Sequence, residues 1–350
     1  MPDIAIASPK QPTLPDLSPA NLALFELQKP FVEPALKLCR AFNTALDVLF
    51  YDVNRLESEL AARGRTIDTG LRLNSQKVPN PKQVLDLTAL TNPGGSVIVV
   101  DADLAPYVSA PFIDMKRFLD FANGPDGCGL HTLTITGVGS SAFGSVAFAW
   151  DVSAALGEPV AAVVPGYGVA DLVPQALGGW FGFEMNDAIQ SLTQTLLAHF
   201  APSLASIGKE LALSTPGRVH AKTGAPVFRK GSAGSDDVHA ILEQVPGITR
   251  LVGHSKGALA IENAVRSLSK ARQQQPMDIL TFGCVISEPF PHYRYFQSLG
   301  LIDGLGLLNS SGHRPESWFA ATHTTNTVDP FSMKVGQIVG DLHQSAIRSG

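Results

Sequence analysis

The sequence predicts an α/β fold in which a mostly parallel sheet is flanked by helices. Short apolar runs rich in β-branched residues alternate with longer segments of helical periodicity, which is the pattern of repeated strand–helix units. A sharp glycine-bounded turn at residues 253–257, between one such run and the next helix, favours the same class. Residues 287–316 are expected to be mainly loop. The expected strands lie at residues 96–100, 130–136, 159–164, 248–252, 278–284, 317–322 and 335–339.

The composition is that of a chain with a large buried core. Of its 350 residues, 45% are hydrophobic and 16% are charged, whereas about a quarter are charged in an average globular protein. The net charge of −5 includes no basic block and no basic helix face, so we expect no nucleic-acid partner. This length accommodates one large domain with insertions, or two smaller domains.

The cysteines and the first residues favour a cytoplasmic protein. Cys39, Cys128 and Cys284 are odd in number and far apart, so we expect buried free thiols in a reducing compartment. Residues 1–20 are rich in proline and have no apolar run after a basic start, so we expect a disordered arm and no secretory signal. No stretch of the sequence is long and apolar enough to predict a transmembrane segment.

The turn Gly253-His254-Ser255-Lys256-Gly257 predicts a serine nucleophile at the carboxyl end of a strand. A β-branched run precedes it, and apolar residues at helical spacing follow it. The two glycines let the strand and the helix approach closely while Ser255 occupies a strained backbone. The helix that starts at Ser255 would direct its first amides and its dipole at negative charge on a substrate. His254 is expected to support the site from behind.

A second glycine loop spans residues 137–144, between the strand at 130–136 and a helix through Trp150. The loop could be part of a glycine motif that binds a dinucleotide cofactor. However, its third glycine does not lie at the spacing of that motif, and no acidic residue ends the next strand. We therefore expect no nucleotide cofactor. The other interpretation is a loop that supplies an amide for binding an oxyanion.

Three motifs together resemble those of the α/β-hydrolase superfamily, and most closely its lipase- and esterase-like serine hydrolases. Residues 137–142 are similar to the H-G-x-G-S-S loop, residues 163–168 to the D-L-P-G-Y-G turn, and residues 253–257 to the nucleophile elbow. They occur in the family's order. Thr136 stands where the family usually has His, and Val164 or its neighbour stands where it has Asp.

This resemblance extends over residues 96 to 345 and implies an α/β-hydrolase domain at 96–350. It implies that the backbone amides of Val138 and Lys256 bind the oxyanion. It also implies substrate-binding roles for Ser140 and Tyr167.

Residues 172–233 form an insertion that a minimal fold of this kind does not need. Trp180, Phe181 and Phe183 lie near its start and are flanked by glycines. We expect a helical lid or acyl-binding cap in which these three aromatic residues contact substrate, with a purely structural subdomain as the alternative.

Residues 21–95 are expected to form an N-terminal helical extension. Apolar residues recur every three or four positions, which predicts one long amphipathic helix over 34–64. Its polar face mixes charges of both signs, so we expect the stripe to pack against protein, within the chain or across a homodimer, and not to enter lipid. The stripe consists of Leu38, Phe42, Leu46, Leu49, Val53, Leu56 and Leu60.

A serine nucleophile needs a histidine that takes its proton and a carboxylate that orients the histidine. In α/β-hydrolases the acid and then the base lie on loops after later strands. His343 follows the last expected strand and is predicted as the base, with His323 as the alternative. Asp329 in its Asn-Thr-Val-Asp-Pro context is predicted as the acid, and Glu288 is the runner-up. Asp303, followed by glycine, is interpreted as part of a simple turn.

Together these residues predict a serine hydrolase that cleaves a carboxylic ester with an apolar acyl part through an acyl-enzyme intermediate. The expected partner is a small-molecule or lipid-like ester. A thioesterase or an acyltransferase would use the same triad, and a non-catalytic scaffold on a lipid or polymer surface is a further alternative. No cluster of His, Cys, Asp or Glu in the sequence has metal-ligand spacing, so we expect no metal and no cofactor.

Overall fold

The computed structural model describes residues 43–69, 84–88, 92, 94–137, 139–165, 233–286, 289–310 and 313–349. The predictions for the arm at 1–20, for Cys39 and for nearly all of the insertion at 172–233 lie outside these residues.

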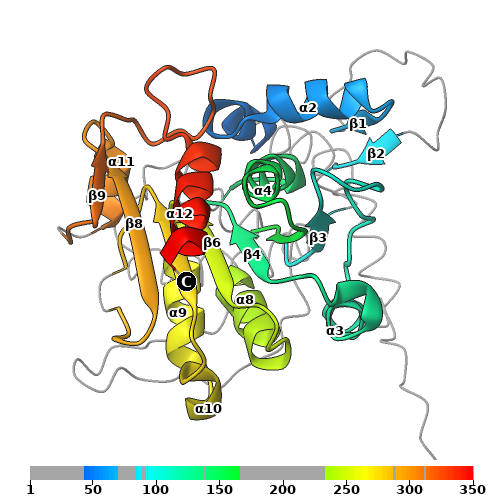
Figure 1. Ribbon diagram of the computed structural model, residues 1–350. Coiled ribbons are helices and arrows are strands. Elements are labelled where there is room, and N and C mark those ends of the chain that lie inside the picture. Colours follow the sequence, from blue (N-terminus) through cyan, green and yellow to red (C-terminus); the bar gives the residue numbers. More distant parts are fainter. Residues whose placement is uncertain are drawn as a thin grey trace, which may run out of the picture.

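The predicted α/β class with a mostly parallel sheet is confirmed. The central sheet has the strand order β3-β5-β4-β6-β7-β8-β9, in which β3 is antiparallel to β5 and the other pairings are parallel (Figure 1). β4 and β5 are buried along their whole length, as expected of parallel strands covered on both faces. The strands are β3 (Val97–Val100), β4 (Thr132–Ile135), β5 (Val160–Val163), β6 (Arg250–His254), β7 (Asp278–Phe282), β8 (Arg294–Gly300) and β9 (Ser317–Phe319).

Helices cover both faces of this sheet (Figure 1). Apolar residues of α2, α4 and α12 share one buried cluster with one face, and those of α3, α8 and α9 share a second cluster with the other face. The helix α4 is buried nearly all round because α2 and α12 pack against it. The helices are α2 (Val53–Ala62), α3 (Met115–Ala122), α4 (Ala142–Leu156), α8 (Ala233–Gln244), α9 (Lys256–Ser267), α10 (Lys270–Gln273), α11 (Gly304–Asn309) and α12 (Val335–Ser349).

The strand β8 lies in the stretch that was expected to be loop. It occupies the sheet between β7 and β9. Its apolar alternation is interrupted by Gln297, which is nevertheless buried. The Gln297 side-chain oxygen accepts a hydrogen bond from the backbone amide of Ile286 at 2.6 Å, and its side-chain nitrogen donates to Glu316 at 3.3 Å. The backbone amide of Gln297 donates to Glu316 at 2.8 Å. A polar residue thus satisfied is tolerated in a buried strand, and hydrophobic periodicity does not reveal it.

The strand expected at residues 335–339 is wrong, because these residues begin α12. Val335, Ile338, Val339 and Leu342 recur at i, i+3, i+4 and i+7, which places them on one helix face against the core. A five-residue window is too short to show this period.

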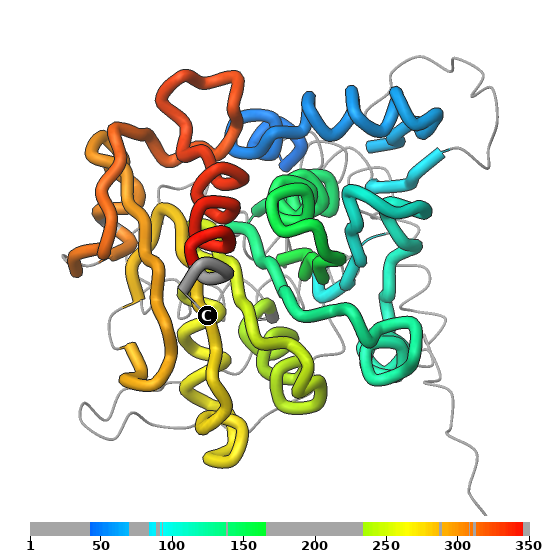
Figure 2. Tube along the Cα trace, viewed as in Figure 1, coloured from blue at the N-terminus to red at the C-terminus, as the bar shows by residue number. Residues whose placement is uncertain are grey.

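The N-terminal extension belongs to the main core, but it is not one continuous helix. Residues 43–50 are helical, the chain turns at Tyr51 and Asp52, and α2 follows. Within the expected stripe, Val53, Leu56 and Leu60 are buried, whereas Leu49 is 59% exposed. The extension also contains strands, because β1 (Thr66–Asp68) and β2 (Val84–Asp86) form a separate two-stranded parallel sheet. Figure 2 shows the blue helix at residues 43–50 beside the orange-red loop that precedes α12.

Two smaller expectations concern cysteines and membranes. Cys284 is buried and Cys128 is exposed, and both are free thiols. The prediction of burial is therefore wrong for Cys128, which ends a short 3₁₀ turn at residues 125–127. Among the described residues, no helix has the length and apolar character needed to span a membrane.

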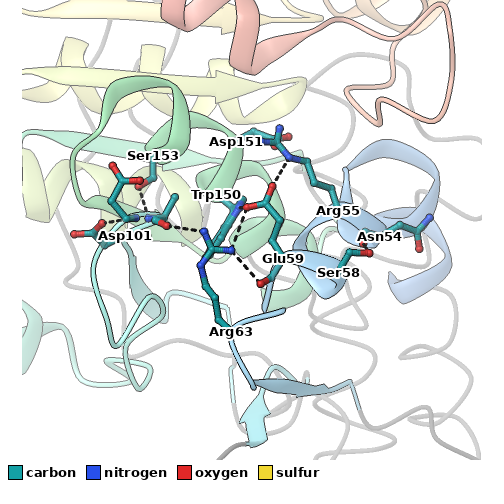
Figure 3. A network of polar contacts seen from close by, with 11 residues as sticks. Asn54, Arg55, Ser58, Glu59, Arg63, Asp101, Trp150, Asp151 and Ser153 are labelled. Atoms are coloured by element: carbon teal, nitrogen blue, oxygen red, sulfur yellow. Dashed lines mark hydrogen bonds and ion pairs between the residues drawn. The ribbon is translucent and has the colours of Figure 1, made fainter. Parts of the chain in front are cut away.

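A polar network joins α2 to α4 (Figure 3). Arg55 pairs with Glu59 at 2.7 Å and with Asp151 at 3.0 Å. The indole Nε1 of Trp150 donates to Glu59 at 3.0 Å, and the Arg63 guanidinium stacks over the Trp150 ring at 5.1 Å. The Asp151 side chain is only 5% exposed. Burial raises the pKa of Asp151 to about 7, against the opposing effect of Arg55.

This raised pKa predicts a pH dependence of stability. The folded protein holds a proton on Asp151 that the unfolded chain releases near pH 4, so the free energy of unfolding falls as pH rises from about 4 to about 7. For one group the slope is about 1.4 kcal/mol per pH unit. Asp151→Asn removes this titration and keeps an acceptor for Arg55. Between about pH 5 and about pH 7.5, the variant should lose on the order of 2 kcal/mol less stability than the wild type.

The measurement is urea denaturation of both proteins at the two pH values. Asp120→Asn is the matched control, because the Asp120 side chain is 66% exposed. If the free energy of unfolding of the wild type and of Asp151→Asn changed equally between the two pH values, the prediction would be contradicted.

Candidate active site

Ser255 lies in a strained turn between β6 and α9. Its backbone φ is +53°, which is rare for a residue other than glycine, and α9 begins at the next residue, Lys256. The flanking glycines are required by close packing. A Cβ on Gly253 would lie 2.9 Å from the amide of Ala258, and a Cβ on Gly257 would lie 2.4 Å from the carbonyl oxygen of Ile135. Tight packing of strand and helix thus forces Ser255 out at the carboxyl edge of the sheet.

A chain of hydrogen bonds runs from Ser255 through His323 to Asp303. The Nε2 atom of His323 lies 2.8 Å from Ser255 Oγ, and its Nδ1 atom lies 2.8 and 2.9 Å from the two carboxylate oxygens of Asp303. A carboxylate only accepts, so Nδ1 carries the ring proton and Nε2 accepts from the serine hydroxyl. The three side chains come from the ends of three parallel strands, namely β6, β8 and β9.

The Asp303–His323 pair is enclosed by backbone. The Asp303 side chain is fully buried, and the amide of Gly306 donates to its Oδ1 at 2.6 Å. Gly283, at the end of β7, has a φ of +69°, and a Cβ there would lie 2.9 Å from the ring of His323. A glycine at this position therefore leaves room for the imidazole beside its carboxylate.

The structure does not bring the predicted base, His343, to Ser255. His343 lies on α12 and lines a pocket with Arg250 and Asp278, which begin β6 and β7. It therefore lies toward the amino edge of the sheet, whereas Ser255 emerges at the carboxyl edge. His323, the alternative base, is the histidine that contacts Ser255.

The side chain of the predicted acid, Asp329, forms hydrogen bonds within its own loop and none with His323. Its carboxylate accepts from the amide of Phe331 at 2.9 Å and from the hydroxyl of Thr322 at 3.2 Å. The carboxylate that contacts His323 is instead that of Asp303, which was expected to lie in a simple turn. The runner-up acid, Glu288, lies outside the described residues. Asp303 lies shortly after the end of β8 at Gly300, so this unpredicted strand is the reason that Asp303 was not expected as the acid.

Of the two residues predicted to bind an oxyanion, the structure describes Lys256. Lys256 contributes the first amide of α9, directly after Ser255. Val138 lies outside the described residues, but its neighbours Gly137 and Gly139 line the pocket at Ser255. The amide of Gly137 already donates to the hydroxyl of Tyr51 at 2.9 Å. The Gly137 amide is therefore not free to bind a substrate atom.

Asp47 holds the glycine loop from the N-terminal side. Its buried carboxylate accepts from the Ser140 hydroxyl at 2.8 Å, and from the hydroxyl and amide of Ser141 at the start of α4. Burial raises the pKa of Asp47 to about 7, although the donors from Ser141 and Ser140 favour its ionised form. Ser140, predicted to bind substrate, lines the pocket while its hydroxyl is bonded to Asp47.

The pocket at Ser255 is partly open to solvent. Leu46 and Phe50, from the helix at residues 43–50, form apolar walls, and the edge of Phe50 meets the His323 ring at a centroid distance of 5.7 Å. Tyr167, expected to bind substrate, and Trp180, Phe181 and Phe183, expected in the lid or acyl-binding cap, all lie outside the described residues. Leu46 and Phe50 were not predicted as pocket residues, and Leu46 was expected only in the packing stripe of the helix.

Comparisons with protein-family models, with curated proteins and with solved structures give no match to this chain. Across the described ranges, no group of three or more His, Cys, Asp or Glu side chains could hold a metal ion. The fold and the site themselves describe an α/β protein with a serine–histidine–aspartate chain at the carboxyl edge of its parallel sheet.

The close approach at Gly257 predicts the effect of a single methyl group. In Gly257→Ala the new Cβ would meet the carbonyl oxygens of Ile135 and Thr136 at 2.4 and 2.7 Å, so the elbow must move. We expect a loss of stability of about 1–3 kcal/mol, as for an overpacked core, measured by thermal and urea denaturation.

Gly340→Ala is the matched control, because a Cβ on this α12 residue would meet its nearest atom at 3.9 Å. Alanine should stabilise that helix by about 0.5–1 kcal/mol. Equal stability of the two variants would rule out the packing argument for the elbow.

Proposed function

We propose that this protein is a serine hydrolase of the α/β-hydrolase kind, which cleaves a carboxylic ester through an acyl-enzyme intermediate. The observation that carries the proposal is the continuous hydrogen-bond chain from Ser255 through His323 to Asp303. It combines a nucleophile, a base and an orienting carboxylate in hydrogen-bond contact, which is the arrangement that activates a serine hydroxyl.

Each of the three residues then has one role. His323 takes the Ser255 proton as Oγ attacks the ester carbonyl, and it returns that proton to the leaving alcohol. Asp303 keeps the proton of His323 on Nδ1 and stabilises the imidazolium that forms. In the second half of the reaction, His323 deprotonates a water molecule that attacks the acyl-enzyme, and Ser255 recovers its proton.

Two features of the backbone support the assignment to the α/β-hydrolase kind. The nucleophile occupies a strand-to-helix elbow with positive φ, and the chain order is serine, acid, base, each after a parallel strand. The oxyanion of the tetrahedral intermediate would lie at the amide of Lys256 and at a second amide from the loop after β4.

The pocket walls support an ester with an apolar acyl part. Leu46 and Phe50 present apolar surface directly beside Ser255. Such a wall excludes water from the reacting carbonyl and favours an alkyl or aryl group over a charged one.

Fluorophosphonate labelling followed by peptide mapping tests this proposal. The wild-type protein should carry the adduct on Ser255, and hydrolysis of p-nitrophenyl butyrate should fall on the order of 10⁴- to 10⁶-fold in Ser255→Ala. His323→Gln and Asp303→Asn should each lower turnover on the order of 10⁴-fold while the proteins remain folded.

His343→Gln and Asp329→Asn are the matched controls, since they make the same chemical changes at positions that do not contact Ser255. Both should stay within about threefold of wild-type turnover. No adduct on Ser255 in the wild type would leave a non-catalytic scaffold, whereas a large loss in His343→Gln would refute His323 as the base.

A further inference from the structure

The chain segment at residues 47–52 contacts both loops that carry the proposed chemistry. On one side, Asp47 accepts from the glycine loop. On the other side, the hydroxyl of Thr324 donates to the carbonyl oxygen of Leu49 at 2.7 Å, and the amide and hydroxyl of Thr325 both donate to that of Phe50 at 2.8 Å. The last carbonyls of a helix have no partner within it, so the loop after His323 caps the helix at residues 43–50.

Tyr51 lies between these two sets of contacts. Its hydroxyl accepts from the amide of Gly137 at 2.9 Å and lies 3.0 Å from Nδ1 of His254. The Nε2 atom of His254 lies 2.9 Å from the carbonyl oxygen of His323. Four groups from distant parts of the sequence therefore form one line, from the glycine loop to the backbone of the proposed base.

The direction of every proton in this line is fixed. A carbonyl oxygen only accepts, so Nε2 of His254 carries a proton and donates to His323. Burial, reinforced by nearby His323, lowers the pKa of His254 to about 3, so the ring is neutral and its Nδ1 is an acceptor. Tyr51 therefore donates to Nδ1 while it accepts from Gly137. Both side chains are almost completely buried, Tyr51 at 3% and His254 at 1% exposure.

We infer that Tyr51 and His254 are a pair of positioning residues. They hold the glycine loop at residues 137–144 and the proposed base, His323, in one fixed relative geometry. This inference rests on the proposed function and assigns to the N-terminal segment a part in that same site. Tyr51 acts through Gly137, and His254 acts through the backbone of His323.

Removing the Tyr51 hydroxyl should loosen the geometry without unfolding the site. In Tyr51→Phe the ring keeps its edge contacts with Phe148 and His254, at centroid distances of 5.9 and 5.3 Å. The amide of Gly137 and Nδ1 of His254 each lose a buried partner. A displacement of about 1 Å in such a site costs on the order of 10²-fold in rate, so we expect kcat to fall by about that factor with KM within about twofold of wild type.

The experiment compares the wild type, Tyr51→Phe, His254→Gln and the double variant with p-nitrophenyl butyrate. Turnover is expressed per molecule of Ser255 that a fluorophosphonate titrates at completion, so misfolded protein does not contribute. Phenylboronic acid serves as a probe of the tetrahedral state, and its affinity should fall in parallel with kcat. Because both residues belong to the same hydrogen-bond chain, their effects on kcat should not be independent. The fold-reduction of kcat in the double variant should therefore be clearly smaller than the product of the two single fold-reductions.

Tyr293→Phe is the matched control. Tyr293 is buried like Tyr51, but its hydroxyl has no hydrogen-bond partner among the described residues, so its turnover should stay within about twofold of wild type. The positioning pair would be overturned by a wild-type kcat in Tyr51→Phe, or by kcat reductions that multiply in the double variant. Either result leaves the fluorophosphonate adduct on Ser255, and with it the proposed function, unaffected. Absence of any Ser255 adduct in the wild type would instead overturn the proposed function, and this inference with it.

Discussion

The site depends on the placement of one imidazole, the His323 ring, between Ser255 Oγ and the Asp303 carboxylate. Its two nitrogens lie within 2.9 Å of partners that come from different strands. Such a contact needs parallel strands that end at the same edge, and it needs space beside β7, where a side chain on Gly283 would strike the ring. The sheet order and this glycine are therefore prerequisites of the hydrogen-bond chain.

The same constraint explains why buried polar groups gather at this edge. Asp47, Tyr51 and His254 are all buried, and each has hydrogen-bond partners from another part of the chain. Leaving any of these groups unpaired would cost about 1–3 kcal/mol, so the loops have few alternative arrangements. The N-terminal segment, which looks peripheral in the sequence, supplies two of these three residues.

The fold class and the strand-to-helix elbow at Ser255 could be predicted because their signals are local. Apolar runs alternate with helical segments, and G-x-S-x-G combines a strained turn with close packing within five residues. The partners of Ser255 could not be placed so directly, since their assignment depended on counting strands. Gln297 concealed β8, and the first turn of α12 was taken for a strand. Because of these two errors, Asp329 and His343 were expected in the hydrogen-bond chain that the structure builds from Asp303 and His323.

The most direct measurement is a crystal structure of the protein after reaction with a fluorophosphonate, because the adduct imitates the tetrahedral intermediate. The account predicts phosphorus bonded to Ser255 Oγ, its phosphoryl oxygen within hydrogen-bond distance of the Lys256 amide, and His323 still paired with Asp303. Phosphorus on another residue, or a histidine other than His323 beside the adduct, would contradict it.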